Sequence, residues 1–349
     1  MTEPIEEATG SVRAVYGRIT WGAYDQIFTV DAATVQKFDC HDDHQTIVEV
    51  AAFDPKRYKT PHPVKLTCTA TGRFLLTNQL DETFSRLAAG ELPEGSRSED
   101  DVKRQSYRDG VHHSYSLPFD QYPTEVQAFM SEIYRTLYEW ASRVWRLLRW
   151  RSDAIGSHEL FQTILASEWS RDGQLPWYKL PVKGYIGTGG WVIPRLDAPV
   201  AYSVQRLLTS GVAEPTSEEL LREAWAACGA NPRAGLLLAV AAAEVGFKEL
   251  VIDLVPEVRW LTLNVQSPPL VRLLSNSLPE LPVRQGVAAR PPREFRRVME
   301  EAVKARNDLA HQGEFDRLDV DLNEILEVVR SMLHQFAYYR GFTWVTPVW

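Results

Sequence analysis

The chain has 349 residues, of which 44% are hydrophobic and 24% are charged, and its formal net charge is -8. At roughly 150 residues per domain this length suggests two domains, each long enough to bury a core. The negative charge excludes a protein that is basic over its whole surface, so any nucleic-acid site must be a local basic patch.

The compartment follows from the cysteines and the apolar segments. The chain has few cysteines, widely spaced and odd in number: Cys40, Cys68 and Cys228. They imply no disulfide framework and favour a reducing compartment. Residues 1–10 lack the apolar core of a secretory signal, and the longest apolar stretch, about 236–245, contains Glu244 and is too short to span a bilayer. We expect a cytoplasmic protein with no membrane partner.

The first part of the chain favours strands because it is rich in β-branched and aromatic residues. Strands are expected within three ranges: 12–30, 46–53 and 64–70. The pair Thr71-Gly72 is expected to end the third strand, and residues 74–76 to begin its returning partner. Residues 88–118 combine polar residues with glycine and proline, which predicts a long loop.

A long helix is expected over 123–151, where apolar residues recur at three- and four-residue steps. Its end interleaves arginines with tryptophans: Arg143, Trp145, Arg146, Arg149, Trp150 and Arg151. These side chains either clamp nucleic acid by stacking, or lie with their arginine stems over the edge of a tryptophan-rich core. Residues 40–44 are of types that bind metal ions: cysteine, histidine and aspartate. No second group of such residues elsewhere in the sequence completes a site, so we predict no metal site and no cofactor.

From about residue 200 the chain is expected to be helical. Thr216 and Glu219 form the pattern of a capping box at a helix start. Asn231-Pro232 predicts a second helix to about Val245, which Gly246 ends or kinks. Further helices are expected over 247–255, from 267 to about 277, over 292–311 and from 321 to 341.

The helix over 292–311 carries an arginine inside its apolar stripe. On an ideal helix, Arg306 falls about 20° from Phe295, in the same sector as Met299 and Ala302. A buried guanidinium needs a carboxylate, a phosphate or a solvated interface. Asn307 and His311 are one turn apart on the neighbouring face, and His311 lies about 140° from Arg306. One helix therefore does not aim both at one atom, whereas two copies packed about a two-fold axis can.

The residues leading into this helix are mainly basic. Between Val283 and Arg306 there are seven basic residues and only three acidic ones. The candidate RNA-binding residues are Arg284, Arg290, Arg293, Arg296, Arg297 and Lys304. Such a cluster suits a nucleic-acid backbone, although a solvated loop explains it as well.

The sequence Arg306-Asn307-Asp308-Leu309-Ala310-His311 resembles the R-N-x-x-x-H motif of the HEPN superfamily. The resemblance covers about 200–341 and includes Gly313 just after the motif helix and one closing helix. It implies a metal-independent endoribonuclease that acts as a homodimer, or else an inactive relative that only dimerises or binds RNA. A toxin or anti-phage role is a further implication of the resemblance. Gly313 stands where partner-modified members carry tyrosine, which makes that form of regulation doubtful here.

The resemblance also implies roles for the motif residues. Arg306 would stabilise the pentacoordinate phosphate, His311 would act as general acid or base, and Asn307 would polarise or position the substrate, leaving a 2′,3′-cyclic phosphate. An acidic residue on an earlier helix would fix this geometry. Glu244 is the candidate, because it interrupts an apolar helix, although it can equally mark a solvated edge.

We therefore expect an α+β protein of two domains. Residues 1–199 form a β-rich region, of no family that we identify, that senses a trigger ligand or protein. Residues 200–349 form an all-α HEPN-like bundle with Arg306, Asn307, His311 and Glu244 as its catalytic set.

Overall fold

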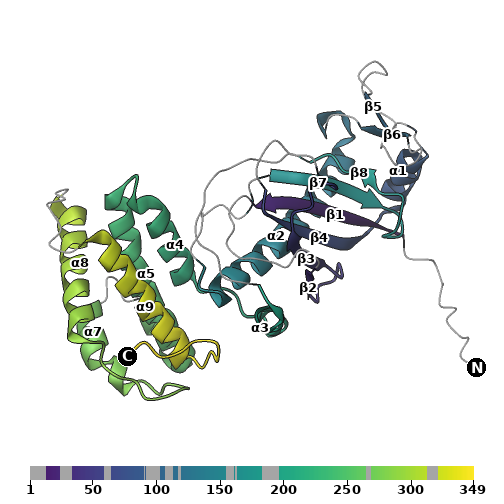
Figure 1. Ribbon diagram of the computed structural model, residues 1–349. Coiled ribbons are helices and arrows are strands. Elements are labelled where there is room, and N and C mark those ends of the chain that lie inside the picture. Colours follow the sequence, from purple (N-terminus) through teal and green to yellow (C-terminus); the bar gives the residue numbers. More distant parts are fainter. Residues whose placement is uncertain are drawn as a thin grey trace, which may run out of the picture. The chain divides into compact units, whose positions relative to one another are not determined.

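The chain folds into two compact units, a sheet unit and a helical unit (Figure 1). The computed structural model describes residues 13–23, 34–58, 64–89, 91, 103–106, 113–116, 119–154, 161, 163–182, 196–264, 269–312 and 321–349. The sheet unit contains the described residues up to 148, those between 161 and 182, and 196–212. The helical unit contains 149–154 and the described residues from 213 to 349. The predicted α+β fold class is confirmed.

The sheet unit is built on a six-stranded antiparallel sheet in the order β2-β3-β4-β1-β7-β8. Its central strands are β1 (Ala14–Ala23) and β4 (Leu66–Leu75). The remaining strands are β2 (Val35–Asp39), β3 (Ile47–Ala52), β7 (Thr163–Ser170) and β8 (Tyr178–Lys179). Helix α1 (Asn78–Ala88) follows β4, with Thr77 capping its first turn.

The expectation of one continuous loop over 88–118 is wrong. The strands β5 (Lys103–Ser106) and β6 (His113–Ser116) pair as an antiparallel ribbon within it. Polar residues can form such a ribbon because its ladder joins backbone groups, which every residue except proline supplies in full.

The expected break at Thr71-Gly72 is also wrong, because β4 runs through both residues. Gly72 pairs with Gly17 of β1, and helix α2 (Thr124–Arg151) crosses this pair. A Cβ atom at Gly17 would lie 2.4 Å from Cγ2 of Ile133. The two glycines thus admit a helix against the sheet instead of turning the chain. The long helix itself is confirmed over nearly its whole expected length.

Helix α3 (Ala198–Thr209) belongs to the sheet unit, although the sequence assigned residues after 200 to the helical part. The side-chain amide of Gln205 explains this, because it accepts from the Asp39 N–H and donates to the Asp39 carbonyl, both at 2.9 Å. This pair of bonds holds α3 at the end of β2. The C-terminal segment of the helical unit accordingly begins after Val212.

Within the ranges given above, the helical unit contains six α-helices. They are α4 (Thr216–Cys228), α5 (Pro232–Leu254), α6 (Arg259–Asn264), α7 (Leu270–Asn276), α8 (Arg293–Gln312) and α9 (Leu322–Tyr339). The described residues also include three short 3-10 turns: η2 (Phe119–Gln121) before α2, and η3 (Pro256–Val258) and η4 (Leu278–Glu280) in this unit. No helix in the described ranges has the length and apolar character needed to cross a bilayer.

Two local predictions for this unit need correction. Asn231 does cap α5, but α5 continues through Gly246 to Leu254 as one helix. Gly246 is buried, and a Cβ there would lie 2.3 Å from Cδ2 of Leu333, so this glycine permits α9 to approach. The apolar contact between helices offsets the low helix propensity of glycine.

The capping box at Thr216 and Glu219 does not form. Pro215 occupies the cap position of α4, and the Glu249 carboxylate of α5 does the capping instead. It accepts from the Thr216 N–H at 2.8 Å and from the Ser217 hydroxyl at 2.6 Å. A carboxylate also suits the positive end of the helix dipole.

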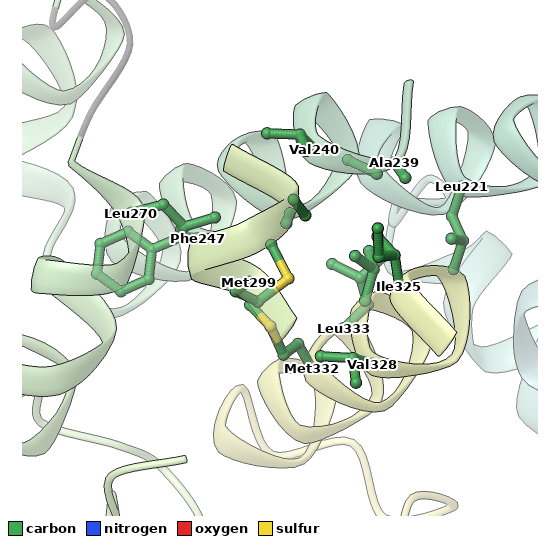
Figure 2. Packing of buried hydrophobic residues seen from close by; sticks show 14 of the residues in the cluster. Leu221, Ala239, Val240, Phe247, Leu270, Met299, Ile325, Val328, Met332 and Leu333 are labelled. Atoms are coloured by element: carbon green, nitrogen blue, oxygen red, sulfur yellow. The ribbon is translucent and has the colours of Figure 1, made fainter. Parts of the chain in front are cut away.

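The core of the helical unit lies between α4, α5, α8 and α9. Six apolar residues of α9 that recur at one- to four-residue steps are all buried: Ile325, Val328, Val329, Met332, Leu333 and Phe336. Figure 2 shows Met299 of α8 close to Met332 of α9, with Phe247 of α5 beside Leu270 of α7. This core fixes the rotation of α8 and therefore the direction in which each of its polar residues points.

Candidate functional site

Helix α8 presents Arg306 at the edge of the core. The preceding turns of the same stripe are buried through Val298, Met299 and Ala302. Arg306 follows on this stripe with a side chain only 18% exposed, whereas Leu309 beyond it is half-buried and Ala310 is exposed. The full burial of the stripe therefore ends before Arg306, and the partly buried guanidinium needs a partner there.

Glu244 of α5 is that partner. Its carboxylate Oε1 accepts a hydrogen bond from Nη2 of Arg306 and forms an ion pair with it. Ala242 and Ala243, just before Glu244, are fully buried. The structure thus brings together the two residues that the sequence analysis paired, and Glu244 does not mark a freely solvated edge.

The surroundings of this pair act on the Glu244 carboxyl in opposite directions. Burial raises its pKa, while the charge of Arg306, the charge of Lys248 and the Arg306 hydrogen bond lower it. The Nε–H of Arg306 is buried and has no hydrogen-bond partner in the described residues. The guanidinium of Arg306 is therefore shielded from solvent and fixed in orientation, and the Glu244 carboxylate already neutralises much of its charge.

Asn307 points to a different place from Arg306. It is exposed and lines a shallow depression of about 330 Å³ on α8 and α7. The other lining residues are Val271, Glu300, Val303, Lys304 and Asp308. Neighbouring positions on a helix differ by about 100°, so Arg306 and Asn307 serve two adjacent surfaces.

Only the backbone position of His311 is within the described part of the chain. It lies in the last turn of α8, one turn beyond Asn307. The His311 side chain and Gly313 lie outside the described residues. The register of α8 therefore groups the backbone position of His311 with Asn307, as predicted.

The six basic candidates differ in what they contact. Arg284 donates to the backbone and carboxylate of Asp253, and Arg297 pairs with Glu294 and Glu324. Arg290 and Arg293 are exposed, Arg296 is half-buried, and Lys304 lines the depression. Internal carboxylates thus neutralise part of the predicted basic surface, which weakens its attraction for phosphate.

The arginines and tryptophans at the end of α2 fit the interpretation as a core edge. Trp145 is fully buried, and Trp150 packs edge-on against Phe342 at 4.8 Å between ring centroids. Arg149 is also buried, at 1% exposure. These aromatic faces are used inside the protein, so they are not free to stack on bases.

The cluster over 40–44 forms the turn between β2 and β3. Asp42 accepts from the Thr46 N–H at 2.6 Å and the Thr46 hydroxyl at 2.8 Å, and His44 stacks on Phe74. Burial raises the pKa of the Cys40 thiol to about 12, which disfavours the thiolate that metals bind. Within the described residues, no cluster of three potential ligands is suited to a metal ion.

Sequence reasoning missed Glu300 and Asp308 as parts of a surface feature. Both lie four residues from Lys304, so their spacing alone places the three charges on one face of α8. The contribution of Val271 could not be found in this way, because it comes from α7. Comparisons of the chain with protein-family models, curated proteins and solved structures find no match.

Proposed function

We propose that the helical unit is a metal-independent endoribonuclease of HEPN type that acts as a homodimer. The observation that carries this proposal is the ion pair between Arg306 and Glu244, because it holds a guanidinium in one orientation beside the exposed Asn307. The resemblance of 306–311 to the HEPN motif supplies the class of reaction, and the pair supplies the positioning that such a reaction requires.

In this proposal the phosphate approaches the edge of α8 at Arg306. The guanidinium stabilises the charge that develops on the phosphorane, with Glu244 as a positioning residue that keeps it in place. His311 removes the proton of the ribose 2′-hydroxyl or protonates the leaving 5′-oxygen, and solvent water carries the other of these two protons. The 2′-oxygen bonds to phosphorus as the bond to the 5′-oxygen breaks, which yields a 2′,3′-cyclic phosphate and a free 5′-hydroxyl.

The dimer follows from the register of α8. Arg306 and His311 are separated by about 140° on an ideal helix, so one copy does not direct both side chains at one phosphate. In the proposed dimer, the two-fold axis brings Arg306 of one copy beside His311 of the other.

A second candidate is an inactive module that dimerises or binds RNA without cutting it. The shielding of Arg306 favours this alternative, because a guanidinium that is 18% exposed and already paired binds an additional phosphate weakly. The two candidates make opposite predictions about cleavage and the same prediction about binding.

The test compares purified full-length wild type with Arg306→Ala, Asn307→Ala and His311→Ala on a labelled structured RNA. Arg330→Ala is the matched control, because Arg330 lies on α9 in the same unit and forms a 2.6 Å ion pair with Asp153 instead of a residue of the candidate site. The proposal expects Arg306→Ala and His311→Ala to reduce the rate of RNA cleavage at least about a hundredfold, and the Arg330→Ala control to cleave at nearly the wild-type rate. RNA that is bound but left intact by the wild type would support the inactive module instead.

A further inference from the structure

The depression on α8 and α7 carries polar side chains that no other described side chain engages. Within the described residues, the side chains of Glu300, Lys304, Asn307 and Asp308 form no hydrogen bond or ion pair with one another or with other residues. Surface charges at four-residue spacing on a helix usually pair with one another when signs alternate. Here they stay available to a ligand.

The apolar part of the depression suits a planar ring. Val271 from α7 and Val303 from α8 line it, and both are half-buried. An apolar surface with polar groups at its margin is a common environment for an unstacked nucleobase.

The charges at the margin disfavour a phosphate as the occupant. Two carboxylates, Glu300 and Asp308, face one ammonium, Lys304. The local charge is therefore negative, which disfavours the phosphate backbone of RNA more than a neutral base. Because the margin offers acceptors and donors together, it suits a group that both donates and accepts hydrogen bonds.

We propose that this depression is a subsite for one nucleobase of the RNA, selective for bases that carry both a carbonyl and an exocyclic amine. The carboxylates accept from the amine, Lys304 donates to the carbonyl, and the Asn307 amide does either. Guanine and cytosine have both groups, whereas adenine has no carbonyl and uracil has no exocyclic amine. This inference rests on the proposed function, because it takes RNA to be the ligand.

The place of the subsite on α8 fits a nucleotide beside the reacting phosphate. Asn307 follows Arg306 directly in the chain, and the backbone of His311 lies one turn further along the same face. A base held here would place its sugar and phosphate near the edge of α8 at Arg306, and the subsite would thereby select the position of cleavage.

Binding of non-cleavable RNA tests the subsite without relying on catalysis. The probes are short, fluorescein-labelled 2′-O-methyl oligouridines with one central guanosine, cytidine, adenosine or uridine, and fluorescence anisotropy measures their affinity for the full-length protein. We expect the guanosine and cytidine probes to bind at least about fivefold more tightly than the other two. The double variant Glu300→Ala, Asp308→Ala should bind all four equally, while Glu257→Ala, which removes an exposed carboxylate outside the depression, should keep the preference.

Each outcome decides the matter. Equal binding of the four probes, binding of none, or a preference that survives in the double variant overturns the subsite. Selective binding by a protein that cleaves no unmodified RNA keeps the subsite and refutes the proposed function. Cleavage of unmodified RNA together with equal binding of the four probes keeps the proposed function and refutes the subsite.

Discussion

Gly246 of α5 lies against Leu333 of α9 so closely that an added Cβ atom would stand 2.3 Å from the Leu333 Cδ2 atom. The contact occurs two residues after Glu244, on the same helix. It therefore sets the distance between α5 and α9 in the region that holds the candidate site.

This contact predicts that Gly246→Ala destabilises the protein. Alanine improves helix propensity by about 1 kcal/mol, but forcing Leu333 aside costs about 1–3 kcal/mol, so the net free energy of unfolding should fall by about 1 kcal/mol. Urea unfolding measures the change. Gly229→Ala is the control, because a Cβ at Gly229 meets nothing within 4 Å and its φ is -75°. Equal stability of both variants would contradict the close approach.

The ion pair between Arg306 and Glu244 predicts strong coupling between the two residues. Arg306→Ala leaves the shielded Glu244 carboxylate without its partner, and should lower the free energy of unfolding by about 1–3 kcal/mol. Glu244→Ala should have a similar effect, and the double variant should cost less than the sum of both. A double-mutant cycle from urea unfolding measures this coupling, and strictly additive effects would exclude the pair.

A pH dependence follows from Glu218 in the first turn of α4. Although part of this residue is accessible, its carboxyl is enclosed, and burial raises its pKa from 4.5 to about 8. Arg222 opposes the rise, whereas Glu214, Asp153 and Glu249 add to it. The folded state thus retains a proton that the unfolded state releases above about pH 4.5, so stability should fall as pH rises from there to about 8.

The variant Glu218→Gln separates this carboxyl from all others. It should remove part of the decrease in the free energy of unfolding between about pH 5 and about pH 8, while Glu257→Gln should leave the profile unchanged. Urea unfolding at several pH values gives both profiles. A Glu218→Gln profile parallel to that of the wild type would show that Glu218 titrates normally.

The proposed dimer predicts complementation between inactive subunits. When Arg306→Ala and His311→Ala proteins are unfolded together and refolded, mixed dimers contain one site with both natural side chains and one with neither. RNA cleavage should therefore return in the mixture at a substantial fraction of the wild-type rate, and each variant refolded alone should stay inactive. A mixture that contains mixed dimers yet cuts no RNA would refute a site shared between subunits.

The features that the sequence predicted well depend on periodicity within one helix. The buried faces of α8 and α9 follow from residues that recur at three- and four-residue steps, and Asn231 caps α5 through a neighbour three residues away. Glu244 is recognisable from the sequence because a carboxylate within an apolar helix is costly to bury unless it has a partner. The same argument identifies Arg306.

The features that the sequence did not predict depend on contacts between distant segments. Glycine permits a turn and a close helix approach equally, so Gly72 and Gly246 gave no indication of the helices that pack against them. Glu249 caps α4 from 32 positions away, and the local Thr216 and Glu219 pattern concealed this. The depression needs α7 beside α8, which no single-helix pattern contains.

The most direct test of the central claim is the end-group analysis of RNA incubated with the full-length protein in excess EDTA. The account predicts cleavage that EDTA does not abolish, products with 2′,3′-cyclic phosphate and 5′-hydroxyl ends, and loss of these products with Arg306→Ala or His311→Ala. RNA that stays intact with and without EDTA, cleavage that EDTA abolishes, or variants that cut as fast as the wild type would contradict it.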